Sequence, residues 1–271
     1  MNVNDLEKKV EWVWLETLKI HRGSPETRIA SSLSPIEVFV ALYYGGILNY
    51  SAVEPLIESR DRLIISKGHG SISMYPILAN LGFFPHEELD RVCKEGGILG
   101  GIPDPIIPGY ETVNGSLGHG LGVATGMALA LKVKKTTQEV FVLTGDGELH
   151  EGSCWEAIMF AGHHGLENLT LIIDDNSTSM LDHTKNIVSH GDLSARLKAF
   201  GWWVDEVDGH DVLAVHKKLD HLKSLKRSNP KALISRTIKG KGVPGLEGHP
   251  LAHIINPKKE VLDNILGERN R

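Results

Sequence analysis

The chain has 271 residues, of which 41% are hydrophobic and 23% charged, a composition typical of a globular protein. Its net charge of −5 argues against a nucleic-acid ligand, and its apolar runs are too short to predict a membrane span. The first residues lack the apolar core of a secretion signal, and two cysteines, Cys93 and Cys154, fit neither a disulfide framework nor a zinc site. We therefore expect a single cytoplasmic domain over residues 1–271.

Hydrophobic spacing predicts alternating helices and strands. A helix is expected over residues 4–20, and Ser34-Pro35-Ile36-Glu37 predicts the start of another, with Ser34 as N-cap and Glu37 closing a capping box. A short strand at 64–65, a helix at 71–81 and a Gly/Pro-rich loop at 96–108 follow. Further helices are expected at 117–133, 152–164, 193–200, 212–222 and 258–266, and strands at 140–143, 171–173 and 232–235. This alternation predicts an α/β fold built on a doubly wound parallel sheet.

Polar side chains follow two of the predicted strands. Gly145-Asp146-Gly147 comes after the first, and Asn176 follows the second. Ligands of such sheets collect at the carboxyl ends of the strands, so we expect these residues to lie close together. Carboxylate and amide oxygens suit Mg²⁺, and glycines let the backbone approach a phosphate. The pattern predicts a magnesium-diphosphate site, although an ordinary strand-to-helix turn with Asp146 as an N-cap would look similar.

Longer stretches around these residues resemble the thiamine diphosphate motif of the transketolase family. The matching segments are Gly145-Asp-Gly-Glu-Leu-His-Glu-Gly-Ser-Cys-Trp-Glu-Ala157 and Asn168-Leu-Thr-Leu-Ile-Ile-Asp-Asp-Asn176. The resemblance extends to Arg60–Gly70, Glu111–Gly120, Gly201–Asp211 and Thr237–Val243, so that it covers roughly residues 30–255 in family order. It implies the thiamine diphosphate-binding fold.

The resemblance also implies cofactors and site residues. The cofactors would be thiamine diphosphate and Mg²⁺ (or Ca²⁺ or Mn²⁺), with Asp146, Asn176 and the carbonyl of Thr178 as metal ligands. The remaining cofactor-binding residues would be His69, Gly115, Ser116, Leu117, Gly145 and Gly147. By contrast, we interpret Gly122 and Gly126 as packing of a helix on the sheet.

The predicted catalytic residues are His69, Arg28, His253 and Glu151, of which the last two match further positions of the family. His253 matches a histidine in the loop after Gly-Lys-Gly, although His249 in the same loop competes for the role. Glu151 matches a carboxylate that couples two active sites across a dimer interface; a first-turn helix carboxylate favoured by the helix dipole would give the same pattern.

The chain departs from the family where substrate is held. Arg28 and Ile102 stand where the family has two histidines, and Ser179-Met-Leu-Asp182 replaces a frequent Gln-x-Asp-Gly. Arginine stays protonated and cannot act as a base, and isoleucine neither donates nor accepts a hydrogen bond. We therefore expect an intact cofactor site with a non-standard substrate, such as an acidic acceptor or a less hydroxylated donor. The alternative is that neighbouring histidines such as His69 and His253 suffice for ordinary ketose phosphates.

The implied activity is transfer of a two-carbon ketol unit from a ketose to an aldehyde. Full transketolases continue into a pyrimidine-binding and a carboxyl-terminal domain, whereas this chain stops at Arg271. We expect a second subunit carrying those domains, in an α2β2 assembly that buries the helices at 117–133 and 155–164.

Two alternatives stay open. An alpha subunit of a 2-oxo acid dehydrogenase or decarboxylase shares Gly-Asp-Gly, but the Ser66-Lys-Gly-His69 and Gly115-Ser-Leu-Gly-His119 blocks argue against it. Loss of two histidines would also fit a degenerate subunit that binds or regulates without turnover.

Overall fold

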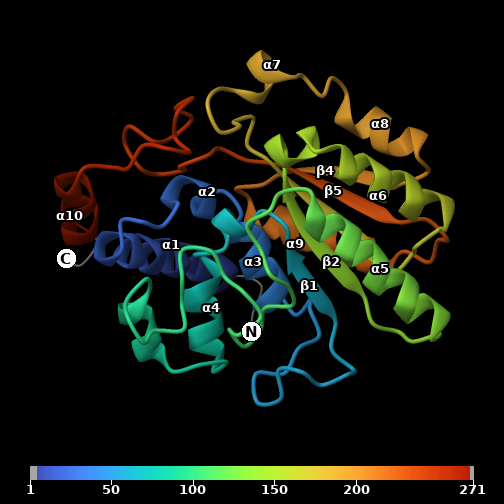
Figure 1. Cartoon of the computed structure of the whole chain (residues 1–271), viewed down its shortest axis with the longest axis horizontal. Coiled ribbons are helices and arrows are strands. Elements are labelled where there is room, and N and C mark those ends of the chain that lie inside the picture. The colour runs from blue at the N-terminus through green and yellow to red at the C-terminus, as the bar shows by residue number, and fades with distance from the viewer. Residues whose placement is uncertain (1–4, 269–271) are drawn as a thin grey trace.

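The computed structural model describes residues 5–268 and is built on one parallel sheet. Its five strands are β1 (Arg62–Ile65), β2 (Val140–Gly145), β3 (Leu169–Asp175), β4 (Trp203–Asp208) and β5 (Lys231–Arg236). They lie in the order β1-β2-β3-β5-β4, and every neighbouring pair is parallel (Figure 1). The predicted doubly wound parallel sheet is confirmed, with β4 as an additional edge strand that the sequence pattern did not predict.

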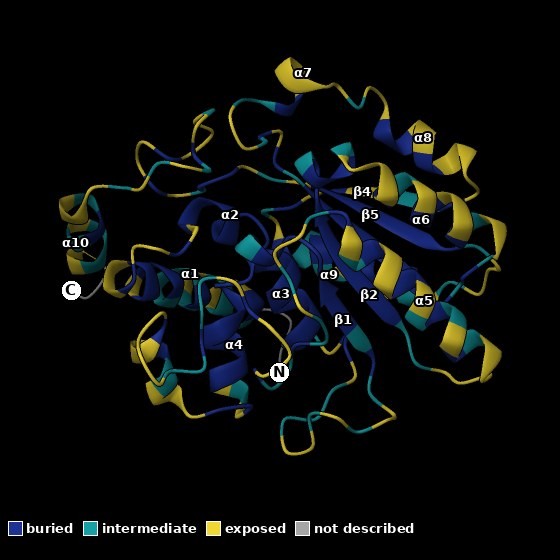
Figure 2. Cartoon of the chain, viewed as in Figure 1, coloured by how far each residue is buried: buried dark blue, intermediate teal, exposed yellow. Residues whose placement is uncertain are grey.

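Helices cover both faces of the sheet. One face carries α5 (His119–Val133), α6 (Gly152–His163) and α8 (Leu193–Ala199). The other carries α3 (Ile36–Tyr43) and α9 (Val212–Ser224), with α1 (Leu6–Gly23) and α4 (Met74–Leu81) packed around them. Side chains of β2 alternate between these cores: Val140 and Val142 join the first, Phe141 and Leu143 the second. Figure 2 shows the strands buried between the two helical layers.

Shorter elements connect these layers. The remaining helices are α2 (Ile29–Leu33), α7 (Thr184–Ile187) and α10 (Lys259–Glu268). Single 3₁₀ turns at Gly68–Gly70 and Gly147–His150 follow β1 and β2 directly, and a third lies at His86–Arg91. The two turns after the strands place their side chains at the carboxyl edge of the sheet.

The predicted capping box at residues 34–37 is wrong. Ser34 has helical dihedral angles (φ −70°, ψ −33°), whereas an N-cap residue needs non-helical ones. Its hydroxyl instead donates to Asp174 Oδ2 over 2.6 Å, and Glu37 Oε1 lies 3.1 Å from His210 Nδ1. Both side chains are therefore used in buried contacts beneath the carboxyl edge of the sheet.

The interpretation of Gly122 and Gly126 is also wrong. Both are exposed on the outer face of α5, and a Cβ atom built on either would meet nothing within 4 Å. The glycine that packs against the sheet edge is Gly120, where a Cβ would come within 2.5 Å of Ser66 Oγ and 2.8 Å of Ser66 Cα.

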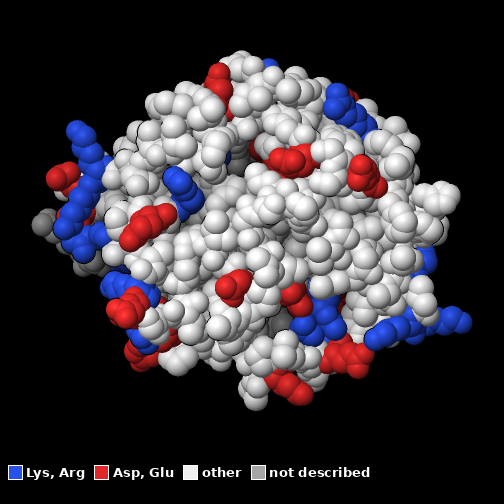
Figure 3. Space-filling view, viewed as in Figure 1, with Lys and Arg blue, Asp and Glu red and all other residues white. Residues whose placement is uncertain are grey.

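Charged side chains are mixed in sign on the face shown in Figure 3, and the surface over α5 is largely uncharged. Among the described residues, we find no helix whose length and apolar character would let it cross a membrane.

Candidate functional site

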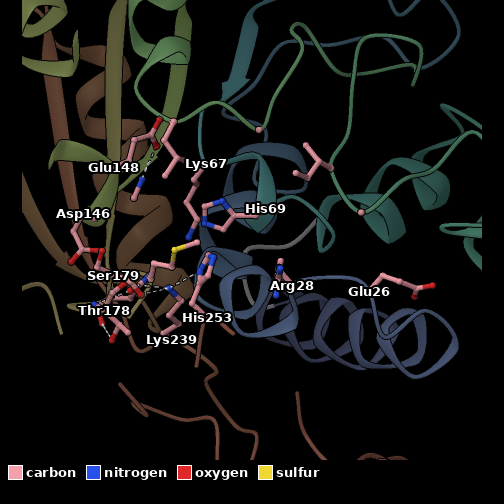
Figure 4. A pocket seen from close by; sticks show the side chains of 18 residues that line it. Glu26, Arg28, Lys67, His69, Asp146, Glu148, Thr178, Ser179, Lys239 and His253 are labelled. Carbon is pink, nitrogen blue, oxygen red and sulfur yellow. Dashed lines mark hydrogen bonds between the residues drawn. The ribbon is translucent and has the colours of Figure 1, made fainter. Parts of the chain in front are cut away.

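A cavity of about 640 Å³ lies at the carboxyl edge of the sheet. Its walls come from segments that follow β1, β2, β3 and β5, together with the chain before α2 and the loops around residues 101–117 (Figure 4). This volume is within the range of small-molecule and cofactor sites, and the position is where open parallel sheets bind ligands.

One end of the cavity presents oxygen atoms. Asp146 is 2% exposed, and its Oδ2 accepts a hydrogen bond from Thr184 Oγ1 at 2.6 Å. Burial raises the pKa of the Asp146 carboxyl to about 6. Asn176 and Thr178 follow β3 and line the same cavity, separated by Ser177, whose positive φ of 57° turns the chain back toward Asp146. The three predicted metal ligands are thus brought into one cavity.

A buried network lies under Asn176. Asp174 forms an ion pair with Lys67 and accepts hydrogen bonds from Ser34 Oγ and from Asn176 Nδ2, the latter at 3.2 Å. Thr237 Oγ1 donates to its other oxygen. Burial alone would raise the pKa of Asp174, but the Lys67 ammonium holds that pKa below its usual value. The amide nitrogen of Asn176 is thereby fixed toward Asp174.

Lys239 connects the oxygen-rich end to the histidines. Its Nζ donates to the carbonyls of Thr178 and Ser179, at 3.2 and 3.3 Å, and lies 3.3 Å from His253 Nδ1. Burial, followed by the nearby charge of Lys67, lowers the pKa of Lys239 to about 8, so its ammonium prevails at neutral pH. Because an ammonium only donates, His253 Nδ1 accepts, and Nε2 carries the ring proton.

His69 and His253 form an edge-to-face pair in the middle of the cavity, with ring centroids 4.9 Å apart. Burial lowers the pKa of His69 well below its usual value and that of His253 to about 4, and nearby cations add to both effects. Both imidazoles are therefore uncharged near neutral pH. The competing His249 is exposed and does not line this cavity.

The other predicted residues divide into two groups. Gly115, Leu117, Gly145 and Gly147 line the cavity, as do Arg28 and Ile102. Ser116 and Glu151 are exposed and do not line this cavity. The role of Ser116 in cofactor binding and that of Glu151 across a dimer interface stay predictions.

Glu148, which the sequence pattern did not single out, also lines the cavity. It is 2% exposed, and its carboxylate accepts from Ser66 Oγ, from the Gly118 amide at 2.9 Å and from the Gly145 amide at 3.2 Å. Burial raises the pKa of Glu148. This carboxylate ties the ends of β1 and β2 to the start of α5.

Lys67, Lys239 and Thr184 were also missed as site residues. Both lysines lie inside the stretches that resemble the family: Lys67 is close to His69, and Lys239 directly precedes the Gly-Lys-Gly segment. Their place in these stretches could have marked them as site residues. For Thr184 there was no such signal, because its contact with Asp146 spans 38 residues.

The oxygen donors fit a hard divalent cation. A carboxylate, an amide oxygen and a backbone carbonyl are ligands that Mg²⁺ accepts while it keeps positions for phosphate oxygens. Two ammonium groups, two uncharged imidazoles and an apolar wall complete the cavity. The fold and this site define a class of protein that binds a phosphorylated organic cofactor at the edge of a parallel sheet.

Sequence comparison identifies the family. Residues 23–263 match the family described as transketolase, thiamine diphosphate binding domain. The chain is 35% identical to one of the subunits of the apulose-4-phosphate transketolase of Actinobacillus succinogenes, over 99% of this chain and 97% of that one. It is also 35% identical to a 6-deoxy-6-sulfo-D-fructose transketolase subunit of a Clostridium species, over 86% of this chain and 84% of that one. The chain belongs to the transketolase family of thiamine diphosphate-dependent transferases.

Solved structures of transketolases share this fold. The transketolase of Campylobacter jejuni superposes with a TM-score of 0.90 at 27% identity, and that of Leishmania mexicana with 0.89 at 26%. The chain is covered over 98% in both cases but spans only 43% and 41% of those proteins. The resemblance to the N-terminal, thiamine diphosphate-binding part of transketolases is thus confirmed.

Proposed function

We propose that this chain holds the magnesium and diphosphate of thiamine diphosphate in a two-chain transketolase. Its partner would be a second subunit that carries the pyrimidine-binding and carboxyl-terminal domains, in an α2β2 assembly in the cytoplasm. The observation that carries the proposal is one cavity with hard oxygen donors at one end and two uncharged histidines beside them. Subunits named for such enzymes match the chain over nearly its whole length.

The residues at the inner end would bind the cation and the diphosphate. Asp146, Asn176 and the Thr178 carbonyl would hold Mg²⁺, and Lys67 and Lys239 would offset the negative charge of the phosphates. Gly145 and Gly147 leave room for close approach of the backbone to the cofactor. When bound, thiamine diphosphate supplies the nucleophilic carbon that carries the two-carbon unit between substrates.

His69 and His253 would act on the oxygen atoms of the substrate. Since both imidazoles are uncharged, each can donate one hydrogen bond and accept another, and can take up or release a proton as charge develops on a substrate oxygen. Both rings are half-buried in the cavity wall, which limits the competition of bulk water for these contacts. Turnover would still require the partner, because the family places further active-site groups on the pyrimidine-binding domain.

Turnover by the separate chain and by the chain with its partner tests this proposal. We expect no ketol transfer from the chain alone and transfer dependent on thiamine diphosphate and Mg²⁺ once the partner is added. Full turnover without a partner would contradict the two-chain arrangement. Cofactor binding by the assembly without any turnover would instead identify a regulatory subunit.

A further inference from the structure

A positively charged side chain without a partner stands at the substrate end of the cavity. Arg28 directly precedes α2 and lines the cavity wall. Within residues 5–268, its guanidinium makes no hydrogen bond or ion pair. Glu26 lines the same cavity but lies apart from Arg28 in Figure 4, and its charge acts on Cys93 and His21. The positive charge of Arg28 is therefore available to a ligand.

The groups around Arg28 lie next to the residues that would act on substrate. Arg28, His69 and His253 line the same cavity, and the charge of Arg28 contributes, after burial, to the lowered pKa of both rings. Figure 4 shows Arg28 on the side of the histidines away from Asp146. With Nδ1 of His253 engaged by Lys239, the Nε2–H of that ring is a second donor in this part of the cavity.

Ile102 gives the neighbouring wall an apolar character. It lines the cavity at 49% exposure, and its Cγ2 lies 3.4 Å from the position of a Cβ built on Gly115. An isoleucine cannot bind a hydroxyl group, so this wall favours a carbon without one. The pairing of a free guanidinium with an apolar wall suits a short group that ends in an anion more than a polyhydroxylated chain.

We propose that Arg28 and Ile102 form a subsite for an anionic substituent close to the reacting carbon, so that one of the two substrates is an acid. The inference rests on the proposed function, because it assigns the substrate class of the same active site. Carboxylate, sulfonate and phosphate share the chemistry that a planar guanidinium recognises through paired hydrogen bonds. The anion belongs to either the donor or the acceptor, and substrate pairs that differ in charge separate these two sources.

The test uses the chain assembled with its partner, thiamine diphosphate and Mg²⁺. The acceptor arm compares glyoxylate with glycolaldehyde, and the donor arm compares hydroxypyruvate, whose carboxylate is attached to the reacting carbonyl carbon, with erythrulose. Arg28→Met removes the charge and keeps a flexible apolar stem, whereas Arg28→Lys keeps the charge without the fork. Arg22→Met is the matched control, since Arg22 is an exposed arginine that pairs with Asp263 outside the cavity.

We expect Arg28→Met to lower kcat/KM for the charged member of one pair by about ten- to hundred-fold, which is the effect of losing a hydrogen bond to a charged group. The neutral member should be little affected, Arg28→Lys should lose less, and Arg22→Met should match the wild type. The arm in which the loss occurs identifies whether donor or acceptor carries the anion.

Equal losses for charged and neutral substrates in both arms, or no loss in either, would overturn the subsite. Calorimetric titration of the same preparations with thiamine diphosphate distinguishes this result from failure of the proposed function. Normal cofactor binding and turnover without charge discrimination refutes the role of Arg28 alone. Absence of cofactor binding or of turnover with every pair refutes the proposed function, and the subsite with it.

Discussion

Replacing the outward-facing glycines of α5 should make the separate chain more stable but weaken its binding to the partner subunit. Gly122 and Gly126 lie inside the helix, where a Cβ would meet nothing within 4 Å. Alanine is favoured over glycine in a helix interior by about 0.5–1 kcal/mol, so Gly122→Ala/Gly126→Ala should stabilise the separate chain by about 1–2 kcal/mol. Gly120→Ala should instead destabilise it, because overpacking against Ser66 costs about 1–3 kcal/mol.

The same double substitution should weaken binding of the partner. Exposed apolar side chains lie near these glycines, with Val123 at 42% on α5 and Met159 and Phe160 at 55% and 41% on α6. If a partner helix packs closely on this face, two added methyl groups overpack the interface by about 1–3 kcal/mol, or roughly five- to more than hundred-fold in dissociation constant.

Urea denaturation of the separate chain and sedimentation of the mixed subunits measure the two effects. Gly23→Ala is a control outside α5, because a Cβ at that glycine also meets nothing within 4 Å. A stabilised chain that assembles with unchanged affinity would show that the outer face of α5 lies outside the interface. A destabilised chain would contradict the packing described for this helix.

Three further predictions concern the site and the buried charges. Asp146→Ala and Asn176→Ala should each weaken binding of thiamine diphosphate and Mg²⁺ by about ten- to hundred-fold in calorimetric titration of the assembly. Asp146→Ala should be the more severe, because it also removes a negative charge. Unchanged binding in both variants would place the metal elsewhere. Lys67→Met should destabilise the chain in urea by about 3 kcal/mol or more, since it leaves Asp174 buried without its cation, and an unchanged midpoint would contradict the ion pair. Burial lowers the pKa of His21 to about 4, so as the pH falls the unfolded chain takes up a proton on this residue before the folded chain does. The contribution of uncharged His21 to stability is complete above about pH 6.5, and the free energy of unfolding falls by roughly 3 kcal/mol as the pH approaches 4. His21→Gln should reduce this pH dependence.

The sequence predicted those features that depend on local pattern and on the geometry of parallel sheets. Asp146 and Asn176 follow adjacent strands, so a common edge had to bring them together. Strand β4 was missed because it lies at the edge of the sheet and carries Asp205 and Glu206, which hide the apolar run typical of a buried strand.

Long-range partners account for the other errors. Ser34 and Glu37 fit the local pattern of a capping box, but their hydrogen bonds go to residues 140 and 173 positions away along the chain. The place of Glu148 in the cavity could not be read from the sequence, because only the fold buries its carboxylate against the Gly118 and Gly145 amides.

The contact between Lys239 and the Thr178 carbonyl has a consequence for the order in which the site fills. The Lys239 ammonium donates a hydrogen bond to the Thr178 carbonyl oxygen, which we assign as a metal ligand, and Lys67 adds a second positive charge nearby. A divalent cation that enters alone meets this repulsion, whereas the diphosphate brings the negative charge that holds both lysines and the metal. Binding of the two should therefore be cooperative, and thermodynamic reciprocity requires that each raise the affinity of the other by the same factor. The Mg²⁺ concentration at half-saturation should accordingly fall as thiamine diphosphate is added.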